Sequence, residues 1–191
     1  ASLNRFTLIL WFSARDIDLL PEGPKTVTPH VLTTPEIAQE FANLLEPDGY
    51  KQKGFDAVKF LSETMTNSPD GSILFVFDNF ETVRAPIELF NWIDTYVRLP
   101  NKVLITTRFR EFKADYPIEV LGMTEAESEE LIQVTAQTLG IVHLLTEDYK
   151  VDLYQESNGH PYVMKVLLGE VAKAGKIVRV ERIVAARDDI L

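Results

Sequence analysis

Short apolar runs separated by polar segments dominate the chain, and four of them are typical of β-strands. Residues Phe6–Phe12, Ser72–Phe77 and Lys102–Thr107 are nearly continuous in apolar side chains, and Ile118–Leu121 is a shorter run of this kind. Continuous rather than alternating hydrophobicity is typical of strands covered on both faces, as in a parallel sheet. The pattern therefore predicts a buried parallel sheet with strands in these four segments.

Apolar residues at helical spacing fill the gaps between these runs. A cap followed by proline at Thr34-Pro35 opens the first predicted helix, the stretch from Phe55 to Met65 forms a second, and Pro86 opens a third. Strands that alternate with helices predict an α/β layered fold. The proline-rich segment Pro21–Thr34 is predicted to be an exposed loop.

The pattern changes after Leu121, where no further strand is predicted. Thr124–Glu127 forms a capping box, in which a hydroxyl and a carboxylate satisfy each other's backbone donors. Further helices are predicted to begin at Thr146 and Pro161, and Gly175 ends the last of them. The chain thus divides into an α/β domain over residues 1–121, a small helical subdomain over 122–176 and a remaining segment over 177–191.

Composition excludes several classes of function. The 191 residues carry 19 Lys+Arg against 29 Asp+Glu, a formal net charge of −10, which argues against direct nucleic-acid binding because phosphate affinity depends on cationic side chains. The chain has no cysteine, so disulfides, thiolate metal sites and a cysteine nucleophile are excluded. No stretch of the sequence is long and apolar enough for a membrane span or a signal peptide, so we expect a cytoplasmic protein.

Two of the predicted strands end in charged residues. The second apolar run is followed at once by Asp78, and the third by Arg108. The carboxyl ends of parallel strands meet at one edge of a sheet, where α/β folds bind ligands. A carboxylate suits Mg²⁺ and an arginine suits phosphate, so the pair predicts a nucleotide site. Alternatives stay open for both residues: Asp78 as a turn or capping residue, and Arg108 as a surface residue or as a partner for Asp115 or Glu111.

The order of these motifs resembles the NB-ARC/STAND class of signal-transduction P-loop ATPases. The resemblance rests on Leu8–Ser13, a strand with a tryptophan, on Asp78–Glu81, similar to a Walker B motif, and on Thr106–Arg108, similar to the sensor arginine. It continues with Gly159–Pro161, similar to the Gly-x-Pro of the helical lid. The tail Glu181–Leu191 resembles the link into a winged-helix domain.

The resemblance implies a switch that depends on ADP and ATP, with Mg²⁺ as cofactor. It assigns Asp78 to the metal, Glu81 to activation of the attacking water, and Arg108 to the γ-phosphate. It assigns Gly159 and Pro161 to the lid, with Pro161 against the adenine. The intact protein would hold ADP in a closed state, exchange it for ATP, hydrolyse slowly and self-associate on activation. Residues 1–121 would be an incomplete P-loop NTPase-like domain, 122–176 its helical lid, and 177–191 the start of a linker to a winged-helix domain.

Two departures from the family pattern affect this interpretation. No G-x-x-x-x-G-K-[ST] phosphate loop occurs in the chain, and the nearest string, Gly169–Lys176, has the wrong spacing and lies in a helical pattern. Asn79 stands where many P-loop ATPases have the acid that activates water, which argues against a conventional AAA+ motor. We therefore expect an internal piece of a longer protein that lacks the first strand and Walker A loop. The alternative is a non-catalytic interaction scaffold that keeps the fold without binding nucleotide.

The resemblance also makes a structural prediction. In this fold the strand before the phosphate loop lies between the strand that ends near Leu121 and the one that ends at Thr107. Without it, backbone groups in the middle of the sheet lack partners, which is energetically costly. We therefore predict a gap at this place, a substitute strand, or another polypeptide that fills it.

Overall fold

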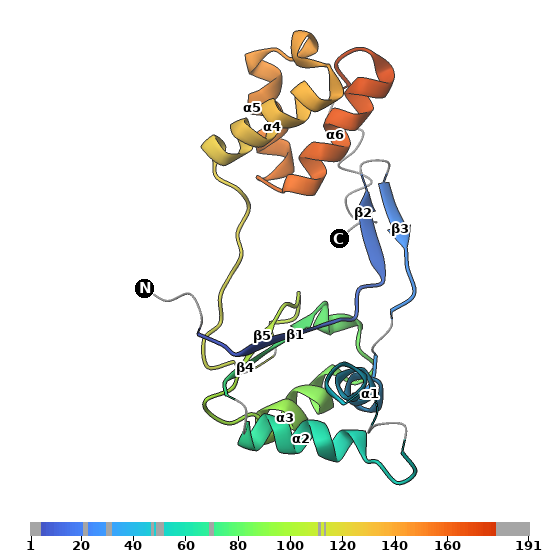
Figure 1. Ribbon diagram of the computed structural model, residues 1–191. Helices are drawn as coiled ribbons and strands as arrows, with labels where there is room; N and C mark the ends of the chain where they lie inside the picture. The colour runs from blue at the N-terminus through green and yellow to red at the C-terminus, as the bar shows by residue number, and fades with distance from the viewer. Residues whose placement is uncertain are drawn as a thin grey trace. The chain divides into compact units, whose positions relative to one another are not determined.

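The computed structural model describes residues 5–20, 23–29, 32–46, 48, 52–68, 71–110, 112 and 114–178 (Figure 1). It divides into two compact units. The α/β unit comprises Ala1–Asp16 and Thr26–Asp115, and the helical unit comprises Ile17–Lys25 and Tyr116–Leu191. The predicted tail Glu181–Leu191 lies outside the described residues.

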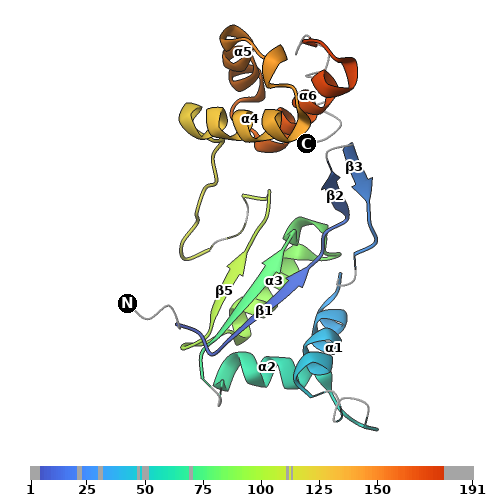
Figure 2. The same cartoon turned by 45° about the horizontal axis from the view of Figure 1, so that its top comes forward.

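A three-stranded parallel sheet forms the centre of the α/β unit. Its strands are β1 (Leu8–Ser13), β4 (Ile73–Asp78) and β5 (Lys102–Ile105), in the order β1-β4-β5. Figure 2 shows the three arrows pointing the same way. The register sets Ser13 opposite Asp78 and Phe77 opposite Ile105. The predicted α/β fold with a parallel sheet is confirmed for these three strands.

The fourth predicted strand, Ile118–Leu121, is wrong. These residues have no regular structure, and the side chains of Ile118, Val120 and Leu121 are 78%, 91% and 75% exposed. A strand is stable only when its backbone groups pair with a neighbour, and no described strand runs beside this segment. In the described sheet β5 is an edge strand. Because Ile118–Leu121 forms no strand, the predicted gap between it and β5 has no second side in the described residues and stays a prediction.

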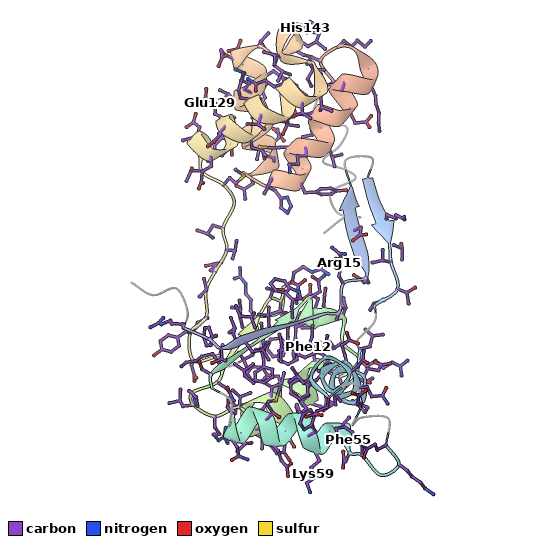
Figure 3. All side chains as sticks on the ribbon, in the orientation of Figure 1. Phe12, Arg15, Phe55, Lys59, Glu129 and His143 are labelled. Carbon is purple, nitrogen blue, oxygen red and sulfur yellow. The ribbon has the colours of Figure 1, made fainter. Side chains whose placement is uncertain are left out.

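Three helices cover one face of the sheet: α1 (Thr34–Leu45), α2 (Ala57–Asn67) and α3 (Pro86–Tyr96). In Figure 1 all three lie on the same side of the strands. Their apolar faces pack against the inward side chains of the sheet in one core, whose fully buried members include Phe41, Leu61, Met65 and Phe75. Phe12 points into this core in Figure 3, whereas Lys59 points outward from α2.

No helix among the described residues of the α/β unit covers the opposite face of the sheet. Side chains alternate along a strand, so Leu10 is 5% exposed towards the helices, whereas Ile9 and Trp11 are each 60% exposed on the other face. Leu104 of β5 is 44% exposed on the same face as Trp11. The predicted covering of both faces is therefore wrong for the described α/β unit. Apolar continuity reveals that a strand could be covered, not that the covering element is present.

Asn101 joins three elements of the α/β unit and is only 2% exposed. Its Oδ1 accepts a hydrogen bond from the amide of Ile73 at 2.8 Å, and its Nδ2 donates to the carbonyls of Thr64 and Met65 at 3.1 and 2.9 Å. The side chain therefore ties the start of β4 to the last turn of α2, just before β5 begins. This role is structural, since each polar atom of the side chain is satisfied within the fold.

The helical unit contains α4 (Glu125–Leu139), α5 (Glu147–Ser157) and α6 (Pro161–Ala174), with a short 3-10 helix η2 (Val142–Leu144) between α4 and α5. A second short 3-10 helix, η1 (Phe80–Thr82), follows β4 in the α/β unit. The three α-helices share a core that includes Ile132, Leu153, Met164, Leu167 and Leu168. The predicted capping box is confirmed, because Thr124 and Glu127 bond each other's backbone amides. These hydrogen bonds lower the pKa of Glu127.

Strands β2 (Ile17–Leu20) and β3 (Gly23–Thr26) pair with each other. The amide of Val27 donates to the carbonyl of Asp16 at 2.7 Å, which joins the two ends of the pair. The predicted loop Pro21–Thr34 is therefore wrong over the length of β3. A two-stranded ribbon leaves one edge of each strand unpaired, so it tolerates a proline that a central strand would exclude.

Candidate functional site

Asp78 ends β4 at the carboxyl edge of the sheet, where hydroxyls from both neighbouring strands bond its carboxylate. Ser13, the last residue of β1, donates from Oγ to Oδ2 at 3.2 Å. Thr106, which follows β5, donates from Oγ1 to Oδ1 at 2.6 Å. Each carboxylate oxygen thus accepts one hydroxyl hydrogen bond, and the orientation of the carboxylate is fixed from two sides.

This carboxylate lies on the uncovered face of the sheet. The register places Ser13 opposite Asp78, and Ser13 shares its face with Trp11 because side chains alternate along β1. Thr106 lies likewise two residues beyond Leu104. The polar side chains at the carboxyl ends of the strands are thus on the same face of the sheet as the exposed apolar side chains. The helices pack against the opposite face.

Asn79 makes the sharp turn that follows β4. It adopts the left-handed conformation, with φ 55° and ψ 51°, which asparagine tolerates better than most residues. Its amide donates to Oγ1 of Thr106 at 3.0 Å, and its carbonyl accepts from the amide and the hydroxyl of Thr82 at 3.1 and 2.7 Å. The turn carries the chain into η1 and so positions Glu81 beside the same sheet edge.

Glu81 and Arg108 form an ion pair at this edge. Nε of Arg108 donates to Oε1 of Glu81 at 2.8 Å, and the backbone amide of Arg108 donates to Oε2 at 3.3 Å. The Glu81 side chain is only 9% exposed, whereas that of Arg108 is 63% exposed. Asp115 and Glu111 were open as alternative partners of Arg108 in the sequence. The structure gives Arg108 an ion pair with Glu81, and Glu111 lies outside the described residues.

Asp78, Glu81 and Arg108 together give the site two negative charges and one positive charge. Among the described residues no group of three or more His, Cys, Asp or Glu side chains could hold a metal ion. A site with one oriented carboxylate fits Mg²⁺, which is usually bound by one or two carboxylates and completes its shell with water and phosphate oxygens. It does not fit zinc, which requires three or four protein ligands.

The other two predicted site residues, Gly159 and Pro161, lie in the helical unit. Gly159 has φ +69°, and a Cβ there would lie 2.3 Å from the carbonyl oxygen of Met123, whose amide donates to the Gly159 carbonyl at 2.8 Å. Only glycine fits this contact, so Gly159 has a structural role in the turn. Pro161 occupies the first turn of α6 and is exposed.

Two polar atoms beside Pro161 lack partners. Nδ1 of His160 and the hydroxyl of Tyr162 are buried without a hydrogen bond in the part of the chain that the structure describes. Buried polar atoms of this kind are uncommon and call for an explanation such as a bound molecule or an ordered water.

Sequence reasoning missed the two hydroxyls that clamp Asp78 and the pairing of Glu81 with Arg108. Ser13 and Thr106 were noted only as parts of longer motifs. A signal was available in the sequence: Ser13 and Thr106 lie at the ends of apolar runs, where the strands of a parallel sheet reach its carboxyl edge.

Comparisons with known proteins leave the family open. No family model matches the chain, and searches of curated proteins and of solved structures gave no significant match. In the described residues no helix is both long and apolar enough to cross a membrane.

Proposed function

We propose that the chain is the nucleotide-binding switch region of an NB-ARC/STAND-class P-loop ATPase that binds ADP and ATP with Mg²⁺. The observation that carries this proposal is the clamped carboxylate of Asp78 at the carboxyl edge of a parallel sheet, beside the Glu81–Arg108 pair. Ligands of α/β proteins bind at this edge. Phosphoryl transfer needs a positioned acid for the metal and a cation for the phosphate.

Each residue of the cluster has a separate role in this proposal. Asp78 would hold Mg²⁺, which neutralises phosphate charge when bound, and Ser13 and Thr106 keep its carboxylate oriented. Arg108 binds the terminal phosphate. Glu81 accepts the proton of the attacking water. Glu81 is the only acid proposed as the base, because the side-chain amide of Asn79 cannot accept a proton at neutral pH. Such a site suits slow hydrolysis, in which the bound nucleotide holds the protein in one conformation.

The uncovered sheet face supports a further strand and helix in a longer protein. The connections from β1 to β4 and from β4 to β5 step across the sheet in one direction, so right-handed crossovers place their helices on one face. A strand on the open edge of β5 that is joined by a helix to β1 would make its connection across the sheet in the opposite direction. A right-handed crossover would therefore place that helix on the opposite face. This helix would cover Ile9, Trp11 and Leu104, and the glycine-rich phosphate loop would lie between that strand and helix, at the edge that carries Asp78.

The helical unit is the lid of the switch in this proposal. Pro161 is exposed at the start of α6 and is available to an adenine ring. The unpartnered Nδ1 of His160 and hydroxyl of Tyr162 are on either side of it in the sequence. Exchange of ADP for ATP would move the lid and lead to self-association.

A second candidate is a scaffold that keeps this fold without binding nucleotide. Two observations favour it: the 191 residues contain no phosphate loop, and the open sheet face presents Ile9, Trp11 and Leu104 to a partner.

Nucleotide content separates the two candidates. The longer protein, with the residues upstream of position 1, is purified without added nucleotide and denatured, and the released small molecules are separated by chromatography. The switch proposal expects adenine nucleotide, mainly ADP, near one equivalent per chain. A sequence upstream that lacks a glycine-rich loop, together with no released nucleotide, would favour the scaffold.

A further inference from the structure

We propose that Glu81 competes with the terminal phosphate of a bound nucleoside triphosphate for Arg108, and that this competition sets the preference of the site for triphosphate over diphosphate. The inference rests on the proposed function and adds a specificity-determining role for Glu81. It also explains why the acid proposed as the base is bonded to the residue proposed to bind the phosphate.

Both oxygens of Glu81 accept hydrogen bonds from Arg108. Oε1 accepts from the guanidinium Nε at 2.8 Å, and Oε2 accepts from the backbone amide at 3.3 Å. A phosphate oxygen that accepts from Nε must therefore displace Oε1. Asp78 is not the competitor, because its oxygens accept from Ser13 and Thr106.

The two partners differ in their freedom to move. Glu81 lies in η1 between Phe80, which is 1% exposed, and Thr82, whose amide and hydroxyl bond the carbonyl of Asn79. Its side chain is 9% exposed, whereas the Arg108 side chain is 63% exposed on a segment beyond the end of β5. We therefore expect the guanidinium to turn towards the ligand while the carboxylate stays in place.

This exchange couples ligand identity to hydrolysis. A bound diphosphate has no γ-phosphate to reach Arg108, so the ion pair persists. With a triphosphate bound, Oε1 of Glu81 is released and can accept a proton from water. The water oxygen then forms a bond to the terminal phosphorus, the bond to the bridging oxygen breaks with its electron pair leaving on the diphosphate, and the proton passes to Glu81.

Binding measurements on the longer protein test the competition. The affinities of Mg²⁺ with a non-hydrolysable ATP analogue and of Mg²⁺ with ADP are measured by calorimetry for wild type, Glu81→Ala and the control Glu88→Ala, an exposed acid on α3. Exposed ion pairs contribute about 0.2–1 kcal/mol, so we expect Glu81→Ala to bind the analogue about 1.4- to 5-fold more tightly. Its ADP affinity and both affinities of Glu88→Ala should match wild type.

The gain in affinity for the ATP analogue that Glu81→Ala brings should require Arg108. In the Arg108→Ala background, Glu81→Ala should leave the affinity for the analogue unchanged. Should Glu81→Ala fail to fold, Glu81→Gln, which keeps an acceptor oxygen but loses the charge, should show a smaller gain in the same direction. Unchanged or weaker analogue binding, or an equal change for ADP, would overturn the competition and leave the switch intact. Wild type that binds neither nucleotide would overturn the proposed function itself.

Discussion

The hydroxyl of Thr106 donates a 2.6 Å hydrogen bond to Oδ1 of Asp78 and accepts one from the amide of Asn79 at 3.0 Å. One side chain at the end of β5 therefore fixes both the carboxylate at the end of β4 and the turn that follows it. The side chain belongs to a segment 28 positions further along the chain, so the parallel register of β4 and β5 creates this contact.

Replacement of Thr106 by valine removes both hydrogen bonds and keeps the shape of the side chain. We expect Thr106→Val to weaken Mg²⁺-dependent ATP binding by the longer protein about 10-fold, because residues that orient a metal ligand typically change affinity by about 10- to 100-fold. Calorimetric titration measures the loss. Thr107→Val is the matched control, since the Thr107 hydroxyl accepts from the amide of Phe109 instead. Equal losses in the two variants would show that Thr106 does not act through Asp78.

Asn101 should be one of the most important polar residues for stability. Asn101→Ala leaves the amide of Ile73 without its partner, whereas the carbonyls of Thr64 and Met65 each lose one of two hydrogen bonds. A buried unsatisfied group costs about 1–3 kcal/mol. We expect a loss of about 2 kcal/mol in the free energy of unfolding of the 191-residue chain, measured with urea. Asn91→Ala, at an exposed position of α3, should stay within about 0.5 kcal/mol of wild type. A similar small change for Asn101→Ala would contradict this role.

The two faces of the sheet should respond differently to substitution. Phe75 is fully buried among the helices, so Phe75→Ala should cost about 3–5 kcal/mol. Trp11 is 60% exposed, and Trp11→Ser in the 191-residue chain should cost under about 1 kcal/mol.

The same Trp11 substitution tests whether a further helix covers the open face. In the longer protein Trp11 would be buried by that helix, and Trp11→Ser should cost at least about 2 kcal/mol more than in the 191-residue chain. Urea unfolding of both proteins gives the comparison. Equal costs in the two would contradict the proposed strand and helix.

Tyr149 should give the helical unit a stability that declines in alkali. Burial, with a smaller contribution from the nearby Asp152 carboxylate, raises the pKa of Tyr149 above its ordinary value of 10.0. A raised pKa in the folded state means that the stabilisation is fully present below about pH 10 and is lost as the pH rises through the folded pKa. The hydroxyl donates to the carbonyl of Val178 at 3.1 Å while it is protonated.

The measurement is the free energy of unfolding as a function of pH. We expect wild type to lose stability above pH 10 faster than Tyr149→Phe, which has no phenol to ionise at this position. Tyr154→Phe, on the same helix α5, should keep the decline of wild type. Parallel curves for wild type and Tyr149→Phe would show that the Tyr149 phenol ionises without effect on folding.

The apolar runs were sufficient to predict β1, β4 and β5, because each is short, continuous and bounded by turn or helix signals. They were not sufficient for Ile118–Leu121, which has the composition of a strand but no described neighbour to pair with. Apolar pattern reports what a segment prefers to bury. Whether it is buried depends on other elements, which is also why Trp11 was expected to be covered and is exposed.

The site was predictable as a location but not as a set of contacts. Charged residues after apolar runs indicated the carboxyl edge of the sheet and named Asp78 and Arg108. The ion pair between Glu81 and Arg108 depends on the left-handed turn at Asn79 and on the register of β4 with β5. An asparagine permits such a turn but does not require it, and the register is set only when the strands pair. For the same reason the clamp on Asp78 became visible only in three dimensions.

The most direct test of the account is a titration of Mg²⁺ and ATP into the longer protein, carried out with wild type, Asp78→Ala and the control Asp94→Ala, an exposed acid on α3. We predict saturable binding by wild type and by Asp94→Ala, and loss of the Mg²⁺-dependent part of the affinity in Asp78→Ala. Equal binding by wild type and Asp78→Ala, or no binding by either, would contradict it.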